Sequence, residues 1–228
     1  MMKRVTFAVI GAVFASSASA QMVGIGRVGV LGGVYDAEAE LSGTSGSGST
    51  DSTEPSFGLL TGYTMALESI FFDLGLEYQT VNGDGDSADF DRTDVLLSVG
   101  TFLPRDFSVS AGYRFGWQGD GFLDDDFYRE TGPFVGVGFP TFPVFADWEM
   151  STSAAVNFTE LDLPGVSQDI DFFGLSGRAA VSKPGLPHTF GLRVQRFNGD
   201  VREGGTKLEL TETYAHLFYQ FNFFPMGR

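Results

Sequence analysis

The chain alternates between apolar and polar residues over a series of segments, each about ten to twelve residues long. A period of two predicts β-strands with one apolar and one polar face. A tilted strand of this length can cross a lipid bilayer. The sequence therefore predicts ten strands, at residues 23–39, 56–67, 70–81, 92–103, 107–117, 130–139, 144–158, 170–182, 188–198 and 208–224.

The polar faces carry the charges. In the strand predicted at 70–81, large apolar residues share one face, while Asp73, Glu77 and Gln79 share the other. In the strand predicted at 107–117, Arg114 stands among Ser and Gly on the face opposite six apolar residues. Lys or Arg on a lipid face costs roughly 2–4 kcal/mol at mid-bilayer, so we expect these charged side chains to point inward.

The connections between the predicted strands alternate in length. Short connections lie at 68–69, 104–106, 140–143 and 183–187, and long polar ones at 42–55, 82–91, 118–129, 159–169 and 199–207. Short periplasmic turns and long extracellular loops are typical of transmembrane barrels. We predict an all-β fold, a single antiparallel up-and-down transmembrane β-barrel of about ten strands. A soluble periplasmic barrel or sandwich has the same alternation and is the alternative.

Aromatic residues favour the membrane interpretation, because many stand near predicted strand ends, where an interfacial girdle would need them. They are Phe57, Phe72, Phe102, Phe107, Trp117, Phe139, Phe158, Phe173, Phe197, Phe221 and Phe223.

The first twenty residues have the three parts of a cleavable secretory signal. Lys3 and Arg4 precede an apolar run at 5–14, and Ala18-Ser19-Ala20 follows. We expect a signal peptide at 1–20 and one barrel domain at 21–228.

Composition narrows the function. The 228 residues carry a net charge of −15. Removal of the predicted signal peptide would also remove Lys3 and Arg4, which leaves 12 basic and 29 acidic residues and a net charge of −17. Such a chain is not expected to hold nucleic acid through phosphate contacts. Cysteine is absent, which excludes disulfides, thiolate metal sites and a cysteine nucleophile.

The C-terminal segment resembles the aromatic-ended final strand of bacterial outer-membrane β-barrel proteins. Its two alternating sets are Ala215, Leu217, Tyr219, Phe221, Phe223 and His216, Phe218, Gln220, Asn222. The resemblance implies a location in the cell outer membrane. It also implies contact with outer-membrane lipid and lipopolysaccharide, and assembly by periplasmic chaperones and the barrel assembly machinery. It fixes no activity, cofactor or extracellular ligand.

Charges on the inward face form the candidate site, a lumen charge network. Its predicted members, with Arg92, are Asp73, Glu77, Asp94, Arg114, Glu130, Asp147, Glu149, Arg178, Arg193, Glu212 and His216. Ten strands enclose only a narrow lumen, and opposite charges on neighbouring strands would close it. The predicted neighbours are Arg114 with Glu130, Glu149 with Arg178, and Arg193 with Glu212 or His216.

Catalytic and metal sites are not expected. His216 with Glu212 could form a base and its orienting carboxylate, and His188 follows a predicted turn, but neither arrangement matches a known catalytic constellation. Asn82–Asp91 places oxygen ligands at alternate positions, yet Ser87 and Thr93 break the calcium-loop signature. A solvated acidic rim accounts for this loop and for Asp124-Asp125-Asp126. The Ser/Gly/Thr-rich segment at 42–53 is predicted to be a flexible surface loop.

Three function classes follow. The first is an anchored barrel with a narrow, charge-paired lumen, a structural or surface-interaction protein that displays acidic extracellular loops. The second is a narrow passive pore for small solutes with a cation bias, set by an acidic excess inside. The third is an outer-membrane hydrolase that uses His216 or His188.

Overall fold

The computed structural model describes residues 22–43, 46–83, 89–123, 128–162, 170–203 and 205–223. The predicted signal peptide at 1–20 lies outside these residues. The strands are β1 (Met22–Gly43), β2 (Gly46–Leu67), β3 (Ile70–Val81), β4 (Phe90–Phe102), β5 (Ser108–Gly119), β6 (Tyr128–Gly138), β7 (Phe142–Phe145), β8 (Trp148–Asp162), β9 (Ile170–Ser182), β10 (His188–Glu203) and β11 (Thr206–Phe223).

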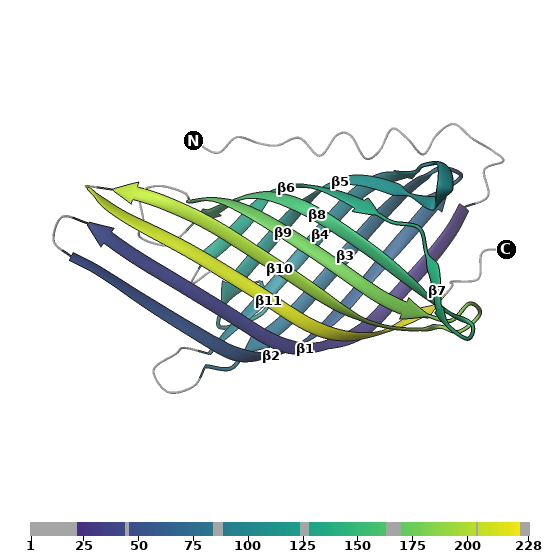
Figure 1. The fold of residues 1–228 in the computed structure, drawn as a ribbon, viewed down its shortest axis with the longest axis horizontal. Coiled ribbons are helices and arrows are strands. Elements are labelled where there is room, and N and C mark those ends of the chain that lie inside the picture. Colours follow the sequence, from purple (N-terminus) through teal and green to yellow (C-terminus); the bar gives the residue numbers. More distant parts are fainter. Residues whose placement is uncertain are drawn as a thin grey trace.

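Ten of these strands close into an antiparallel up-and-down barrel (Figure 1). Each pairs with its neighbour in the sequence, β1 pairs with β11, and β6 pairs with β8, with Val135 opposite Val156. The short β7 pairs only with the start of β8. The predicted fold class and strand number are therefore confirmed. The described residues contain no helix long and apolar enough to cross a membrane.

The strands separate apolar from polar side chains as predicted. In β3 and β5, Ile70, Leu74, Val109 and Tyr113 are exposed on the outside. Arg114, in contrast, is buried on the inside. Phe197 is an exception among the predicted girdle residues, because it shares the parity of Arg193 and lies fully buried in the lumen.

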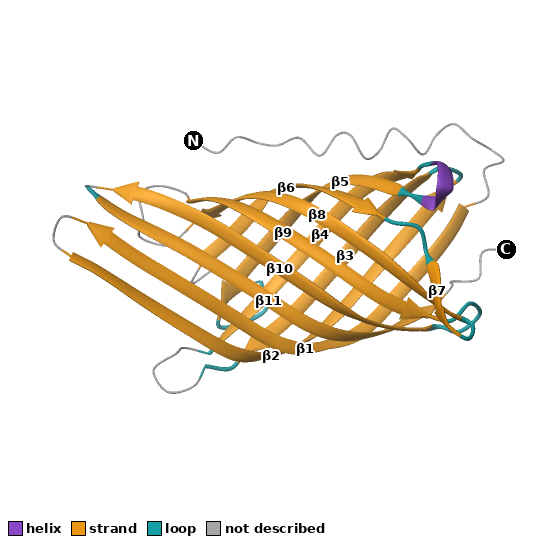
Figure 2. Ribbon diagram, in the orientation of Figure 1, coloured by secondary structure: helices purple, strands orange, loops and turns teal. Residues whose placement is uncertain are grey.

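The two ends of the barrel differ. One end, at the right in Figure 2, has the connections at 68–69, 103–107, 139–147 and 183–187, including a 3₁₀ turn at Pro104–Asp106. We call it the turn end. At the other end, the hairpin end, the β1–β2 and β10–β11 hairpins project at the left of Figure 1.

Two predicted long loops are instead strands. The long polar connection predicted at 42–55 lies in the β1–β2 hairpin, whose pairing continues to Gly43 opposite Gly46. The segment at 199–207 continues the β10–β11 hairpin to Glu203 opposite Thr206. Neither segment has an apolar face, so hydrophobic periodicity could not reveal them. Ladder and side-chain hydrogen bonds form them, including Thr53 Oγ1 to Asp36 Oδ1 at 2.6 Å.

The predicted strand at 144–158 is displaced. Residues 142–145 form β7, and the chain turns at Ala146, which has a positive φ of 46°, before β8 begins at Trp148. The predicted turn at 140–143 thus overlaps β7. Because the residues around this turn are mostly apolar, the alternation of apolar and polar residues does not mark its position.

The hairpin end of the lumen is filled by a hydrophobic cluster. Its members come from β1, β3, β4, β6, β8, β9, β10 and β11. They are Tyr35, Val81, Phe90, Tyr128, Leu161, Ile170, Phe172, Phe197 and Tyr214. These residues form a buried core within the barrel.

Candidate functional site in the barrel lumen

Arg92 of β4 lies next to this hydrophobic core, and its side chain has an exposed fraction of 0%. Its Nε donates a hydrogen bond to Oδ2 of Asp94 at 3.0 Å. Its Nη1 donates to the hydroxyls of Tyr128 (2.8 Å) and Tyr214 (2.7 Å). Its Nη2 forms an ion pair with Glu130. One guanidinium group therefore joins β4, β6 and β11 through the lumen.

Arg114 and Glu212 complete this group. Nε and Nη2 of Arg114 donate to Oδ1 of Asp94 at 3.0 and 2.9 Å. Glu212 Oε2 lies 3.5 Å from Nη1 of Arg92 and accepts a hydrogen bond from Tyr214 at 3.1 Å. We name the set the Arg92 cluster: Arg92, Asp94, Arg114, Tyr128, Glu130, Glu212 and Tyr214.

The Arg92 cluster brings three carboxylates to two guanidinium groups in a buried setting. Isolated buried charge is costly, and multiple hydrogen bonds and ion pairs offset that cost. Thr159 Oγ1 donates to Glu130 Oε1 at 2.8 Å. Gly116 provides space, since a Cβ there would lie 2.8 Å from Asp94 Oδ1. Each charged group has an ion-pair partner within the cluster, while Nη1 of Arg114 is buried without a hydrogen-bond partner among the described residues.

A second set of charges lies nearer the turn end. Arg27 of β1 forms two hydrogen bonds with Asp73 of β3, at 2.7 and 2.8 Å. Arg193 of β10 forms an ion pair with Glu77 of β3. Arg178 of β9 donates to Gln220 Oε1 at 3.2 Å.

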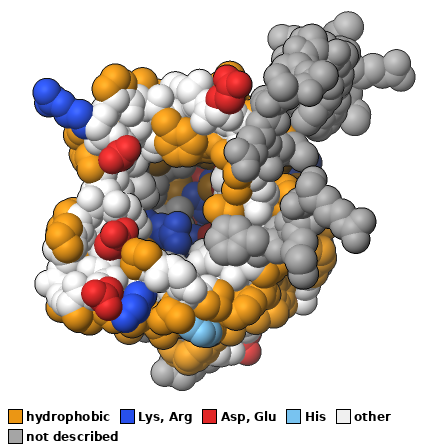
Figure 3. All heavy atoms as spheres, turned by 90° about the vertical axis from the view of Figure 1, so that its right-hand side faces the viewer, with side chains coloured by type: hydrophobic (Ala, Val, Ile, Leu, Met, Phe, Trp, Pro, Cys, Tyr) orange, Lys and Arg blue, Asp and Glu red, His pale blue; other side chains and the backbone are white. Residues whose placement is uncertain are grey.

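These charged residues line a cavity of about 480 Å³ in the turn-end half of the lumen. We call this cavity the vestibule. Figure 3 looks toward the turn end and shows a hollow mouth with basic side chains inside it. A smaller cavity of about 100 Å³ is lined by Arg27, Arg178, Arg193, Glu77 and His216, among others.

Several predicted neighbours are wrong. Arg193 lies opposite His216 across the β10–β11 pair, as one alternative stated, but its carboxylate partner is Glu77 rather than Glu212. The partner in line with Arg178 across β8–β9 is Ser153, not Glu149.

Arg114 and Glu130 belong to the same cluster, but they are not directly opposed. Glu130 of β6 lies opposite Gly116 of β5. Arg114 of β5 forms its ion pair with Asp94 of β4, the neighbouring strand on the other side. An arginine side chain is long, so its guanidinium group can bind a carboxylate that is not directly opposite on the next strand. Strand pairing alone does not predict such a partner.

Asp147 and Glu149 do not join the network in the lumen. Asp147 is exposed in the turn before β8 and pairs with Lys183 at 2.9 Å. Glu149 lies near the same end, opposite Ser182. Both differences follow from the displaced start of β8.

His216 lies close to Ser56 in the interior of the barrel. Its Nε2 is 2.7 Å from Oγ of Ser56, and both residues have an exposed fraction of 0%. Its Nδ1 has no hydrogen-bond partner among the described residues. The predicted orienting group, Glu212, bonds instead to Tyr128, Tyr214 and Arg92. Among the described residues, the Ser56–His216 pair therefore lacks the orienting third group of a nucleophilic site.

His188 belongs to an aromatic group at the turn end. Its Nδ1 is 2.8 Å from the hydroxyl of Tyr219, its ring stacks on that of Tyr219, and it contacts Phe221 edge-on. His188 therefore packs among aromatic residues at the rim of the barrel. No carboxylate is among its partners in the described residues.

Sequence reasoning missed several lumen residues. The alternation pattern does not single out Arg27, whose neighbours are Gly and Val. It also places Glu54 in a loop, although Glu54 is buried. The tyrosines of the Arg92 cluster are also missed, because Tyr128 falls in the connection predicted at 118–129 and the predicted network contains only charged residues and His216. Parity with Glu130 and Glu212 in β6 and β11 would have identified Tyr128 and Tyr214.

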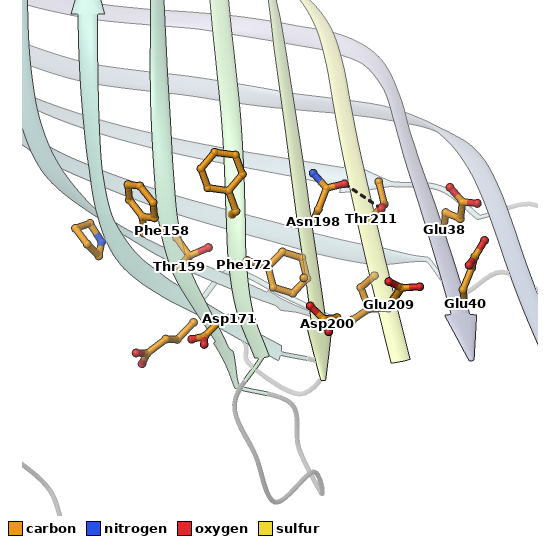
Figure 4. Close-up of a pocket in the computed structure, with 15 residues that line it drawn as sticks. Glu38, Glu40, Phe158, Thr159, Asp171, Phe172, Asn198, Asp200, Glu209 and Thr211 are labelled. Atoms are coloured by element: carbon orange, nitrogen blue, oxygen red, sulfur yellow. Dashed lines mark hydrogen bonds between the residues drawn. The ribbon is translucent and has the colours of Figure 1, made fainter. Parts of the chain in front are cut away.

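The outside of the hairpin end carries a row of carboxylates. Glu40, Glu209, Asp200, Asp171 and Glu160 are directly opposite one another in turn, across β1, β11, β10, β9 and β8. We call these five the acidic row. They line a recess of about 770 Å³ (Figure 4). Lys207 contacts two of them, Glu209 and Asp200.

The predicted loop sites fall mainly outside the described residues. In the loop at 82–91, residues 84–88 lie outside them, as do all three residues of Asp124-Asp125-Asp126. At the edge of the former loop, Gly83 N donates to Asp89 Oδ1 at 2.8 Å.

No protein-family model and no curated protein matches the chain. Among solved structures, it is similar to the outer membrane protease OmpT from Escherichia coli (11% identity, 88% of this chain and 97% of that chain, TM-score 0.46). It is also similar to the β domain of the Bordetella autotransporter BrkA (12% identity, 90% and 100%, TM-score 0.45). A third similar structure is Neisserial surface protein A (14% identity, 86% and 97%, TM-score 0.32). At these values the likeness concerns barrel architecture alone.

Proposed function

We propose that the protein is an integral outer-membrane barrel with a sealed lumen, acting as a structural or surface-interaction protein. The exposed apolar belt supports the membrane location. Val30, Leu59, Val135, Leu175 and Leu217 are at least half exposed on the outer surface. An apolar belt around the whole barrel would be unfavourable in water and is suited to lipid.

The main support for a sealed lumen is the Arg92 cluster, together with the hydrophobic core beside it. Arg92 and Arg114 are buried, and Phe197 and Tyr214 fill the space next to them. A hydrated path would need these groups to separate and expose unpaired charge to a narrow pore. The interior therefore favours a packed barrel over a channel.

The hairpin end supports a role at the surface. Outward-facing Asp36, Glu38 and Glu40 follow Val34 in β1, which places the outer part of the hairpin beyond the apolar belt. Carboxylates do not suit the hydrocarbon core. The protein would present these projecting, acidic hairpins to the outside, next to lipopolysaccharide. Export and insertion would use periplasmic chaperones and the barrel assembly machinery.

Ion conductance tests the sealed lumen directly. Mature protein, refolded and checked by heat-modifiable gel migration, would be inserted in a planar bilayer under a salt gradient. We expect no steady conductance. Steady cation-selective steps that weaken in Glu77→Gln would instead establish the pore alternative.

The hydrolase alternative has a separate test. Lipase and peptidase assays of the folded barrel should detect no activity. Activity that is lost in His216→Ala or His188→Ala would contradict the proposal.

A further inference from the structure

The vestibule has an excess of positive charge. Its charged lining consists of Arg27, Arg178 and Arg193 against Asp73 and Glu77, so three guanidinium groups face two carboxylates. The rest of its described lining is uncharged. This part of the lumen therefore differs from the Arg92 cluster, where carboxylates outnumber guanidinium groups.

Among the three arginines of the vestibule, Arg178 is the one without a carboxylate partner in the described residues. Arg27 pairs with Asp73 and Arg193 with Glu77, whereas Arg178 has no ion pair among the described residues. One of its N–H groups donates to Gln220, and its guanidinium carbon lies 4.6 Å from the centre of the Phe218 ring. A guanidinium group has five N–H donors, so most of those of Arg178 are free for a ligand.

The position of Arg178 gives a ligand access. Arg178 lies inside the barrel but is exposed, because it borders the vestibule and not packed side chains. Glu149, the acidic residue predicted beside it, is four positions along β8 from the residue opposite Arg178, about 13 Å away at strand spacing. Arg193 also lines the vestibule, and its Nη2 is buried without a hydrogen-bond partner in the part of the chain that the structure describes.

The other lining residues indicate what kind of anion would fit. Apolar side chains of Phe71, Leu96 and Phe134 line the same cavity, together with hydroxyls such as those of Ser153 and Ser176. A hydrated inorganic anion would gain little from the apolar groups. A carboxylate attached to a small apolar group could use both parts, because the guanidinium can bind a carboxylate in a bidentate manner.

We propose that the vestibule binds a small organic carboxylate from the turn end, with Arg178 as the residue that binds its carboxylate group. This inference is independent of the sealed lumen, since the vestibule needs an opening only at one end.

Benzoate is a suitable probe, because it combines a carboxylate with one apolar ring. Isothermal titration calorimetry would use the folded mature barrel in a non-ionic detergent and a low-chloride buffer. We expect saturable benzoate binding, weaker binding of inorganic phosphate and no binding of benzyl alcohol. Absence of benzoate binding would overturn the proposal, and phosphate binding more tightly than benzoate would overturn the assignment of an apolar carboxylate.

Variants then locate the site. Arg178→Gln should weaken benzoate binding about tenfold or more, since it removes charge-assisted hydrogen bonds, and Arg178→Lys should retain more of the affinity. The matched control is Arg129→Gln, because Arg129 is an exposed arginine paired with Asp162 on the outside. Heat-modifiable migration verifies that each variant folds. Equal benzoate affinity in Arg178→Gln and Arg129→Gln would overturn the site.

Discussion

Arg92 and Asp94 lie two positions apart on the inward face of β4, and Nε of Arg92 donates to Oδ2 of Asp94 at 3.0 Å. Asp94 in turn accepts from Arg114 on β5. A carboxylate held between two guanidinium groups therefore ties β4 to β5 inside the lumen. Under the proposed function, the same contacts would also occupy the space that a permeating ion needs.

Removing Arg92 should be strongly destabilising. Arg92→Gln would leave Asp94, Glu130 and Glu212 short of positive charge, and breaking a buried ion pair costs about 3–5 kcal/mol. Denaturant unfolding of the refolded barrel would measure the loss. The control is Arg129→Gln, because Arg129 forms an exposed pair with Asp162, and such pairs contribute about 0–1 kcal/mol. Similar losses in the two variants would mean that the Arg92 cluster does not stabilise the fold.

Adding one methyl group at Gly116 should also disturb the Arg92 cluster. The new Cβ would lie 2.8 Å from Asp94 Oδ1 and 3.3 Å from Nη2 of Arg92. We expect Gly116→Ala to lower the free energy of unfolding by about 1–3 kcal/mol, as overpacking does. Gly177→Ala is the control, since a Cβ there would meet no described atom within 4 Å beyond Gly177 and its two chain neighbours. A loss at Gly177 as large as that at Gly116 would contradict the packing argument.

The sequence predicted the fold best where one face of a strand meets an apolar surrounding. β3 was predicted at 70–81, which are its observed bounds, because Ile70, Leu74 and Asp73 mark its two faces. The parts of the hairpins beyond the apolar belt were not predicted, because neither of their faces meets an apolar surrounding. Both faces of Gly46–Thr53 are largely solvent-exposed, so backbone pairing there leaves no period-two hydrophobic pattern.

The lumen contacts were harder to predict than the strands. Parity placed Arg193 and Glu77 on inward faces, but their strands, β10 and β3, are not neighbours in the sheet. Their ion pair crosses the interior. Sequence alternation gives the direction of a side chain, whereas contacts across a lumen depend on barrel closure, strand stagger and side-chain length.

The acidic row should destabilise the hairpin end through like-charge repulsion. Asp171 lies between Asp200 and Glu160, and none of the ion pairs found among the described residues includes it. Asp171→Asn should raise the free energy of unfolding by about 0.2–1 kcal/mol, the usual range for cross-strand pairs. The gain should shrink in high salt, which screens exposed charges.

Asp162→Asn provides the contrast for this prediction. Asp162 pairs with Arg129 at 3.0 Å, so its neutralisation removes an attraction instead of a repulsion. Denaturant unfolding at low and high salt would compare the two variants. A destabilised Asp171→Asn variant would argue against repulsion within the acidic row.

The outer part of the β1–β2 hairpin should be dispensable for folding. The described side chains at 46–51 are exposed, and Leu41 lies opposite Gly48. Replacing residues 41–48 with Asn-Gly, a favoured two-residue turn, would join Glu40 to Ser49 without breaking the pairing below. We expect unchanged heat-modifiable migration and an unchanged unfolding midpoint.

Tyr35→Ala is the matched control on the same strand. Tyr35 is buried and contacts the rings of Phe90 and Tyr214, with centroids at 5.2 and 4.9 Å. Its removal should cost roughly 3 kcal/mol or more, as for other large aromatic side chains in cores. If the shortened hairpin failed to fold while Tyr35→Ala folded normally, stability would reside in the projecting hairpin. That result would remove the basis for treating the hairpin as a surface available to partners.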